Sequence, residues 1–409
     1  MSQPFFSIVL PTKNRSFLIH EAVECVLAQT FADWELIIAD NSDDEVTRDL
    51  IAQYPDPRIR YCRSGGLDMA DNWEFGAAQA KGEYVCMIHD KHLLKTRALA
   101  RIHAEVKDHR HPCVCWLVDW FDDRGVRPKV TPERGNGRTC VNSAEAILDG
   151  FLTPFGDPAC LMPYPQRACM HRDLVARMRS SAVGRLYHPL CPDITCAALL
   201  LAYADHVVQI NESLVVSATN KHSSGRSFIG GKSIQDLNTS TGRSTEQLLG
   251  RSIEAFFLHV PVKTFTYVTN IYSDYMFVRD KVGERLERHP LDHERFFTES
   301  FNSILASCLF GKKDIHKDLV IWEEALAKEP ADVRSRVAKK IAEKGSVRRQ
   351  LWRAHMKRLR FALGVPALEA KVKRLLGRKA KPVKWPTALD YVRWDRAQHA
   401  SETAAESIT

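Results

Sequence analysis

The sequence lacks the features that mark several common classes of protein. None of its 11 cysteines belongs to a paired CxxC set, which argues against a zinc site, and their odd number favours a reducing compartment over a disulfide framework. No window of about 18 apolar residues exists, so we expect no segment to span a bilayer. The N-terminus has no basic region followed by an apolar core, so we also expect no signal peptide.

Glycine-rich phosphate-binding motifs are also missing. No GxGxxG follows the first expected strand, and no GxxxxGK[ST] occurs in the chain. These absences disfavour a dehydrogenase-type dinucleotide fold and a P-loop enzyme. A nucleotidyltransferase is disfavoured as well, since its activated-phosphate loop is absent. If the protein binds a diphosphate, a metal ion and side chains must neutralise its charge.

Positive charge is concentrated near the C-terminus. The chain has a net charge of +8, whereas residues 331–385 alone hold 18 Lys or Arg and only 3 Asp or Glu, so the remainder is net acidic. Within 348–363 the cations alternate with Leu, Trp and Phe, a pattern that suits an anionic membrane surface. Nucleic-acid binding and a solvated helical extension are the alternatives.

Apolar strand-like runs alternate with helical apolar spacing through the first 125 residues. The expected strands cover 6–11, 34–40, 59–63, a run from Gly82 to Ile88, and 114–121. Strands that alternate with helices of this length predict βαβ units, and hence an α/β fold with a mostly parallel sheet and helices on both faces. Residues 207–216 are expected to form two further strands around a turn.

Polar side chains follow three of these strands. Thr12 and Asn14 follow the first, Asp40 the second, and Asp90 and His92 the fourth. Because ligands of open α/β sheets bind beyond the carboxyl ends of strands, these groups should line one crevice. A carboxylate after the second strand suits a ribose hydroxyl or a base edge. Asp90 with His92 suits Mn²⁺ or a similar ion whose other ligands are phosphate oxygens and water; the alternative is a solvated polar loop.

Four segments in order carry a family resemblance: residues 7–15, 26–31, 35–42 and 80–85. Together they resemble the N-terminal half of family 2 glycosyltransferases, which have the GT-A fold, and the resemblance covers about residues 5–230. It implies a nucleotide-sugar donor, a divalent metal (Mn²⁺ or Mg²⁺) and inversion at the anomeric carbon. By position, it implies that the nucleotide sugar contacts Pro11, Thr12, Asn14, Arg15, Asp40, Asn72, His89 and Asp90.

The sequence departs from the family at the acidic Asp-x-Asp cluster, which here reads His89-Asp90-Lys91-His92. An Asp-x-His version is similar to that of polypeptide N-acetylgalactosaminyltransferases, so the resemblance still implies metal binding by Asp90 and His92. The alternative is that Lys91 supplies positive charge directly and that the metal is weak or absent.

Two further residues take roles from the resemblance. Asp193 follows Pro192 at the start of an apolar helix, where the family places its catalytic base. A helix N-terminus would keep this carboxylate ionised, although a plain first-turn Asp is the simpler interpretation. His222 resembles the family's downstream His and would be a third metal ligand or a diphosphate contact; a solvated basic loop is the alternative.

These observations combine into one hypothesis. Residues 1–230 form the glycosyltransferase domain, 231–330 a helical region packed on it, 331–385 a basic amphipathic segment, and 386–409 a partly disordered tail. We expect a cytoplasmic enzyme, peripheral on the inner membrane, that transfers a sugar to a saccharide or lipid-linked acceptor hydroxyl in surface polysaccharide or glycolipid assembly. The rival hypothesis is a non-catalytic relative that acts as a scaffold in a membrane polysaccharide complex.

Overall fold

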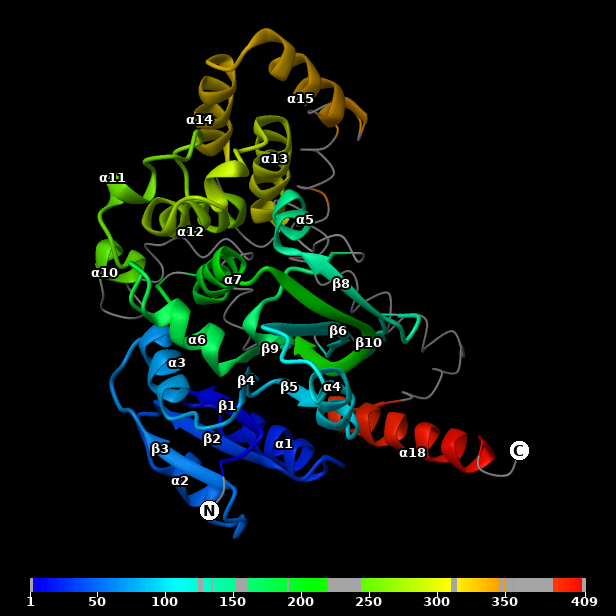
Figure 1. The fold of residues 1–409 in the computed structure, drawn as a ribbon. Coiled ribbons are helices and arrows are strands. Elements are labelled where there is room, and N and C mark those ends of the chain that lie inside the picture. The colour runs from blue at the N-terminus through cyan, green and yellow to red at the C-terminus, as the bar shows by residue number, and fades with distance from the viewer. Residues whose placement is uncertain are drawn as a thin grey trace, which may run out of the picture.

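A mixed β-sheet forms the centre of the computed structural model (Figure 1). The structure describes residues 3–123, 128–133, 135–151, 160–189, 191–219, 244–309, 315–343, 345, 349, 356 and 385–406. Within these residues the strand order is β3-β2-β1-β4-β9-β6-β10-β5, with β7 paired to β6 and β8 to β10. The strands are β1 (Phe6–Thr12), β2 (Trp34–Asp40), β3 (Ile59–Arg63), β4 (Tyr84–Met87), β5 (His92–Leu94), β6 (Cys113–Asp122), β7 (Lys129–Thr131), β8 (Thr139–Ser143), β9 (Ala168–His171) and β10 (His206–Thr219).

The predicted α/β fold is confirmed. Strands β3, β2, β1 and β4 run parallel to their neighbours, and β10 runs parallel to β6, whereas β9 is antiparallel to both β4 and β6. Every residue of β1 and β2 is buried, because helices cover both faces of the sheet and both faces of each strand must be apolar. This parallel half aligns the carboxyl ends of β1, β2 and β4.

The end of the sheet differs from the prediction in one respect. Residues 207–216 form part of a single long strand, β10, and not two strands around a turn. Its register against β6 shifts between Ile210 and Ser213 and again between Ser213 and Val215. The polar residues that we read as a turn therefore form a bulge, which bends a strand without ending it.

Two apolar cores flank the sheet. One packs against α1 (Ser16–Leu27), α2 (Val46–Ile51), α4 (Ala98–Val106) and α18 (Ala388–Glu406). The other packs against α3 (Met69–Ala78), α5 (Ala144–Asp149), α6 (Arg172–Arg179) and α7 (Pro192–Tyr203). A short 3₁₀ helix, η1 (Pro165–Arg167), precedes β9. Because the side chains of a strand alternate between its two faces, neighbours such as Ile8 and Val9 belong to different cores.

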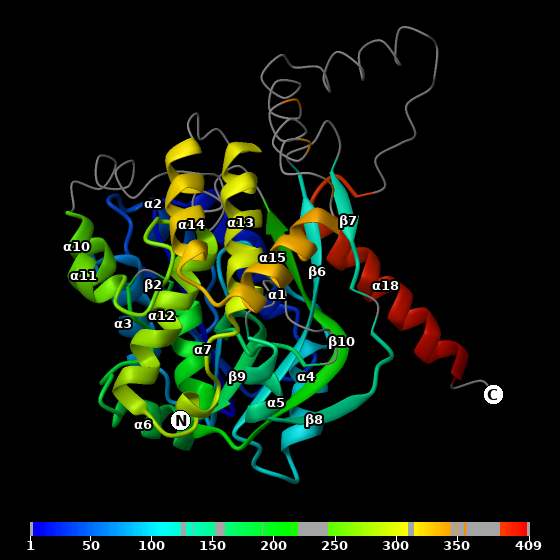
Figure 2. The ribbon, with the colours of Figure 1, turned by 90° about the horizontal axis from the view of Figure 1, so that it is seen from above.

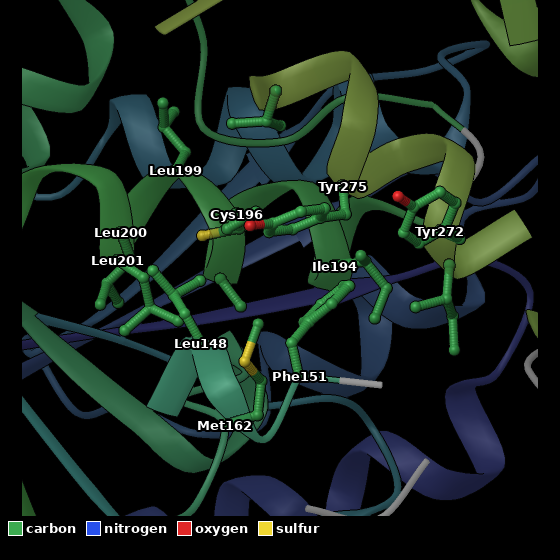
Figure 3. Packing of buried hydrophobic residues seen from close by; sticks show 14 of the residues in the cluster. Leu148, Phe151, Met162, Ile194, Cys196, Leu199, Leu200, Leu201, Tyr272 and Tyr275 are labelled. Atoms are coloured by element: carbon green, nitrogen blue, oxygen red, sulfur yellow. The ribbon is translucent and has the colours of Figure 1, made fainter. Parts of the chain in front are cut away.

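Helix α7 lies at the centre of the second core. Its sequence is apolar on all sides, which is typical of a fully buried helix, and most of its residues are buried. Figure 3 shows Leu148 and Met162 on one side of it and the rings of Tyr272 and Tyr275 on another. The position of α7 is therefore fixed by contacts from several elements far apart in the chain.

A group of helices after residue 244 extends this second core. It comprises α10 (Thr245–Leu249), α11 (Ile253–Phe256), α12 (Tyr267–Val282), η2 (Leu286–Arg288), α13 (His293–Leu309), α14 (His316–Ala327) and α15 (Ala331–Glu343). Helices α13 and α14 lie side by side in both views (Figures 1 and 2). One continuous apolar cluster runs from Val85 of the sheet to Trp322 of α14. The helices thus share a core with the sheet.

The C-terminal tail is helical where we expected partial disorder. Helix α18 spans Ala388–Glu406, and it projects from the body of the molecule in both views (Figures 1 and 2). Its first turns bury Leu389 and Val392 in the first core. Asp395 also forms a buried ion pair with Lys95, whose Nζ lies 3.0 Å from a carboxylate oxygen of Asp395. The first turns of α18 are therefore part of the folded unit, whereas the expected partial disorder of residues 386–409 stays a prediction.

Most cysteines serve as small buried side chains. The ten cysteines whose side chains are described are free, and six of them are buried. Burial raises the pKa of the Cys115 thiol to about 12, which makes it an inert apolar group. No helix in the described part of the chain combines the length and the apolar composition needed to cross a bilayer.

Candidate active site

The carboxyl ends of β1, β2 and β4 bring the predicted nucleotide-binding residues together. Pro11 and Thr12 end β1 and pair in register with Ala39 and Asp40 of β2. The Thr12 hydroxyl lies 3.4 Å from a carboxylate oxygen of Asp90, which follows β4. The strand ends that we expected at one edge of the sheet therefore lie together, as the contact between Thr12 and Asp90 shows.

Asn14 joins the turns that follow β1 and β2. Its side-chain amide donates to Asp43 at 2.6 Å, its side-chain oxygen accepts the Asp43 N–H at 2.9 Å, and its main-chain N–H donates to the Ser42 hydroxyl at 2.9 Å. Its φ of 54° places it in the left-handed region, which Asn tolerates better than most residues. Asn14 is exposed, and we call the solvent-facing turns that it joins the rim of the strand ends.

Asp40 and Asn72 lie beneath this rim and are buried. The Asp40 carboxylate accepts the Ser42 N–H at 2.9 Å and the Tyr61 hydroxyl at 2.7 Å, and it has no exposed surface. The Asn72 side chain donates to the Ala39 carbonyl at 3.0 Å and accepts from the Ser64 hydroxyl at 2.7 Å. Both side chains form hydrogen bonds within the protein, so their role is to hold the loops at these strand ends in place.

Asp90 is buried among cationic groups. Its side chain is 3% exposed, and Arg15 lies 3.4 Å from its second oxygen. Burial raises the pKa of Asp90, whereas Arg15 and Lys91 act in the opposite direction and lower it. The Asp90 carboxylate thus lies near two cations, Lys91 from its own turn and Arg15 from the turn after β1.

The two histidines of this turn stack on each other. The rings of His89 and His92 lie 4.8 Å apart with an interplanar angle of 16°, and His89 also contacts Trp73. The His89 main-chain N–H donates to Nδ1 of His92 at 3.3 Å. Burial, together with nearby positive charge, lowers the pKa of His89 to about 3 and that of His92 well below its usual value. Both imidazoles are consequently neutral near pH 7.

The turn offers a partial fit to a divalent cation. A neutral imidazole and a carboxylate are both metal ligands, and Nδ1 of His92 is engaged, which leaves Nε2 for a metal. The described residues contain no group of three or more His, Cys, Asp or Glu that could hold a metal ion. His222, the predicted third ligand, lies outside the described residues. Asp90 and His92 can therefore hold an ion only if the diphosphate supplies further oxygens.

Asp193 occupies the first turn of α7 and lies near Lys91 of the turn after β4. One of its oxygens accepts the Ile194 N–H at 3.0 Å, and the other lies 3.4 Å from the side-chain amide of Gln166. Burial raises the pKa of Asp193, and the charge of Lys91 is among the influences that lower it. The charges of Asp90 and Asp193 both raise the pKa of Lys91 against the effect of burial, so Lys91 lies near both carboxylates.

Several residues around the site escaped the sequence analysis. Tyr61 and Arg63 of β3 lie against Asp40, at 2.7 Å and 4.0 Å, and Gln166 of η1 lies against Asp193. Nothing in the sequence near Gln166 marks it, because its role depends on the packing of η1 against α7. The carboxyl end of β3 was predictable as part of the site, because a third parallel strand ends at the same edge of the sheet.

Comparison with known proteins identifies relatives of the first part of the chain. The model of the family described as "Glycosyl transferase family 2" matches residues 7–162. This segment of the chain belongs to glycosyl transferase family 2. The resemblance stated from the four sequence motifs is thereby confirmed. The family 2 segment holds every predicted nucleotide-binding residue, whereas Asp193 lies beyond it.

Two curated relatives of the family 2 segment come from bacterial glycan assembly. The GalNAc(5)-diNAcBac-PP-undecaprenol beta-1,3-glucosyltransferase of Campylobacter jejuni is 30% identical over 103 residues, which are 24% of this chain and 33% of the relative. The putative colanic acid biosynthesis glycosyl transferase WcaA of Escherichia coli is 34% identical over 94 residues, which are 22% of this chain and 33% of the relative. The chain thus spans about one third of the length of these relatives.

Among solved structures, S. aureus TarS residues 1–349 in complex with UDP-GlcNAc aligns with 83% of this chain and 92% of that chain. The TM-score is 0.48 at 14% sequence identity.

Proposed function

We propose that the protein is a glycosyltransferase that moves a sugar from a nucleoside-diphosphate sugar to an acceptor hydroxyl with inversion at the anomeric carbon. The observation that carries the proposal is that Asp90 at the strand ends, in contact with Thr12, and Asp193 at the start of α7 both lie near Lys91. Membership of the 7–162 segment in family 2 supports it.

In this proposal the strand ends of the family 2 segment bind the donor. Thr12, Asn14 and Arg15 line the nucleotide side, while Asp40 and Asn72 keep the loops in place. Arg15 and Lys91 would neutralise diphosphate oxygens, since both lie near the buried Asp90 carboxylate. A divalent ion held by Asp90 and His92, when bound, would stabilise the charge that develops on the leaving diphosphate.

Asp193 would act as the general base. Inversion requires a carboxylate on the acceptor side that takes the proton of the attacking hydroxyl. Burial raises the pKa of Asp193, which increases its basicity toward such a proton. The helix N-terminus and the Ile194 N–H favour the ionised form, so the carboxylate stays available as a base near neutral pH.

The substitution Asp193→Asn tests this assignment. It should lower kcat for transfer by about 10²- to 10⁴-fold, the usual contribution of a general base, and leave donor affinity near that of the native protein. Asp205→Asn is a matched control, because Asp205 lies just beyond the other end of α7 with a side chain that is 82% exposed. Retained turnover by Asp193→Asn, measured as nucleoside diphosphate release with acceptor present, would remove the base from the proposal.

A non-catalytic scaffold is the second candidate. The observation in its favour is that Asp90 already contacts Arg15 and is 3% exposed, which leaves little carboxylate surface for a metal. Calorimetry with nucleotide sugars separates the two candidates. Donor binding that strengthens with Mn²⁺ supports the enzyme, whereas absence of binding with and without Mn²⁺ supports the scaffold.

We further propose that the acceptor is lipid-linked or part of a growing surface polysaccharide. The names of the C. jejuni and E. coli relatives point to such acceptors, and the basic segment 331–385 suits an anionic membrane surface. Because α18 belongs to the folded unit, truncation at residue 331 would also remove structural contacts. Replacing the six cations of 348–360 by Gln keeps α18, and this variant should lose binding to anionic liposomes; unchanged binding would contradict the membrane proposal.

A further inference from the structure

The loop that leads into α7 rests on the helices that follow residue 244. Gly250 ends α10 with a φ of 66°, and a Cβ at this position would approach Cε1 of His188 to 2.9 Å and Cγ of Pro189 to 3.1 Å. The ring of His188 lies 4.2 Å from that of Phe277 in α12. The approach to the proposed base is therefore shaped by residues from another part of the chain.

Asp274 of α12 makes the central contact with this loop. Its side chain is fully buried, and one oxygen accepts the main-chain N–H of Cys191 at 2.9 Å. Cys191 is the N-cap of α7, and no side chain of its own caps the helix. The hydrogen bond from Asp274 thus fixes the backbone two residues before Asp193.

Arg251 holds Asp274 in place. Its guanidinium lies 2.6 Å from the other Asp274 oxygen and 2.8 Å from the Ser273 hydroxyl, and it packs between the rings of Phe256 and Phe277. The Arg251 side chain is 6% exposed. Replacing a buried ion pair by apolar residues is often neutral or stabilising, so stability alone does not account for this pair.

The orientation of Asp193 depends on this backbone. Its carboxylate accepts the N–H of Ile194, which belongs to the same first turn of α7, so a shift of the turn moves the carboxylate with it. A displacement of about 1 Å at a reacting group can lower a rate by about 100-fold. Loss of the contact between Asp274 and Cys191 would therefore lower the rate of transfer by moving the Asp193 carboxylate.

We propose that Asp274, supported by Arg251, is a positioning residue that fixes the first turn of α7 and thereby the orientation of Asp193. The proposal rests on the function proposed above, and it makes the helices of residues 244–282 part of the catalytic apparatus. They carry no catalytic residue in this account, and they act on the reaction through the loop before α7.

Asp274→Asn, measured by steady-state kinetics with donor binding in parallel, tests the inference. The change keeps the size of the side chain but weakens both of its contacts. We expect kcat to fall about 10- to 100-fold, with donor Kd and donor KM within twofold of the native values. Asp280→Asn is the matched control, because Asp280 is an exposed carboxylate of the same helix that pairs with His259. It should leave kcat within twofold.

A second variant covers the case in which Asp274→Asn leaves Arg251 unpaired and the protein does not fold. The double variant Arg251→Gln with Asp274→Asn removes both charges together, and it should show the same loss of kcat with donor Kd retained. Native kcat in either folded variant, or equal losses in kcat and donor affinity, would overturn the inference. If Asp193→Asn were active, the base assignment would fail; if only Asp274→Asn were fully active, the positioning role alone would fail.

Discussion

The two walls of the candidate site are built in different ways. The donor wall comes from the ends of neighbouring strands and their turns, and its internal contacts, such as those of Asn14 with Ser42 and Asp43, join residues of adjacent βα units. The base wall is the start of a single helix, which is contacted by Gln166 of η1 and by Asp274 of α12, and Asp274 is in turn held by Arg251. A repeated strand–helix pattern can specify the first wall, whereas only the complete fold creates the second.

The largest difference between the two walls should appear when the donor wall loses its carboxylate. Asp90→Asn should lower kcat/KM on the order of 100-fold, since the turn loses both the proposed metal ligand and the partner of Arg15. Unlike Asp193→Asn, it should weaken donor binding, which titration with the nucleotide sugar can measure. Unchanged donor affinity would show that Arg15 and Lys91 alone hold the diphosphate.

A cavity made in the core beside Arg251 should lower the stability of the protein. Phe256 is fully buried and lies 5.2 Å from the Arg251 guanidinium, so Phe256→Ala should reduce the free energy of unfolding by about 3–5 kcal/mol. Denaturant unfolding measures the loss. Leu258→Ala is the control, because Leu258 is 66% exposed and its loss should change stability by less than about 0.5 kcal/mol. A Phe256→Ala protein that unfolds like the Leu258→Ala control would contradict the packing described.

The base wall should also give the protein a distinct pH dependence of stability. Burial raises the pKa of Asp274 to about 6, while Arg251 opposes the shift. Between about pH 4 and pH 6 the folded protein then binds more protons at this group than the unfolded chain, so this contribution to stability is present at low pH and is lost as pH rises through 6. Its size is at most about 3 kcal/mol, from about 1.4 kcal/mol per unit of pKa.

Asp274→Asn should flatten this part of the curve of unfolding free energy against pH. The native protein and the variant would be compared by denaturant unfolding at several pH values between 4 and 7. The same slope in both proteins would assign the pH dependence to other groups. Asp90 of the donor wall shows the same balance, since burial raises its pKa while Arg15 and Lys91 oppose the shift.

These contrasts also show what the sequence could reveal. Strand ends such as Thr12, Asp40 and Asp90 were identified from local patterns, because a parallel sheet places the residue after each strand at a common edge. The sequence did not show that Asp40 and Asn72 are buried braces, since burial depends on the packing of loops above them. Arg251 in the turn after α10 and Asp274 in α12 had no local signal, because an isolated charge in a turn or an amphipathic helix is usually solvated.

The smallest expected effect concerns the rim of the donor wall. Asn14→Ala removes the two side-chain hydrogen bonds to Asp43, and since both residues are exposed, the loss of stability should be about 1 kcal/mol or less. Asn14→Gly would keep the backbone conformation, whose φ is 54°, without the side chain. If the two variants raise donor KM equally, the side chain matters; if only the Ala variant does, the left-handed backbone is what shapes the rim. The two variants therefore distinguish the side-chain contacts of Asn14 from the backbone conformation that it adopts.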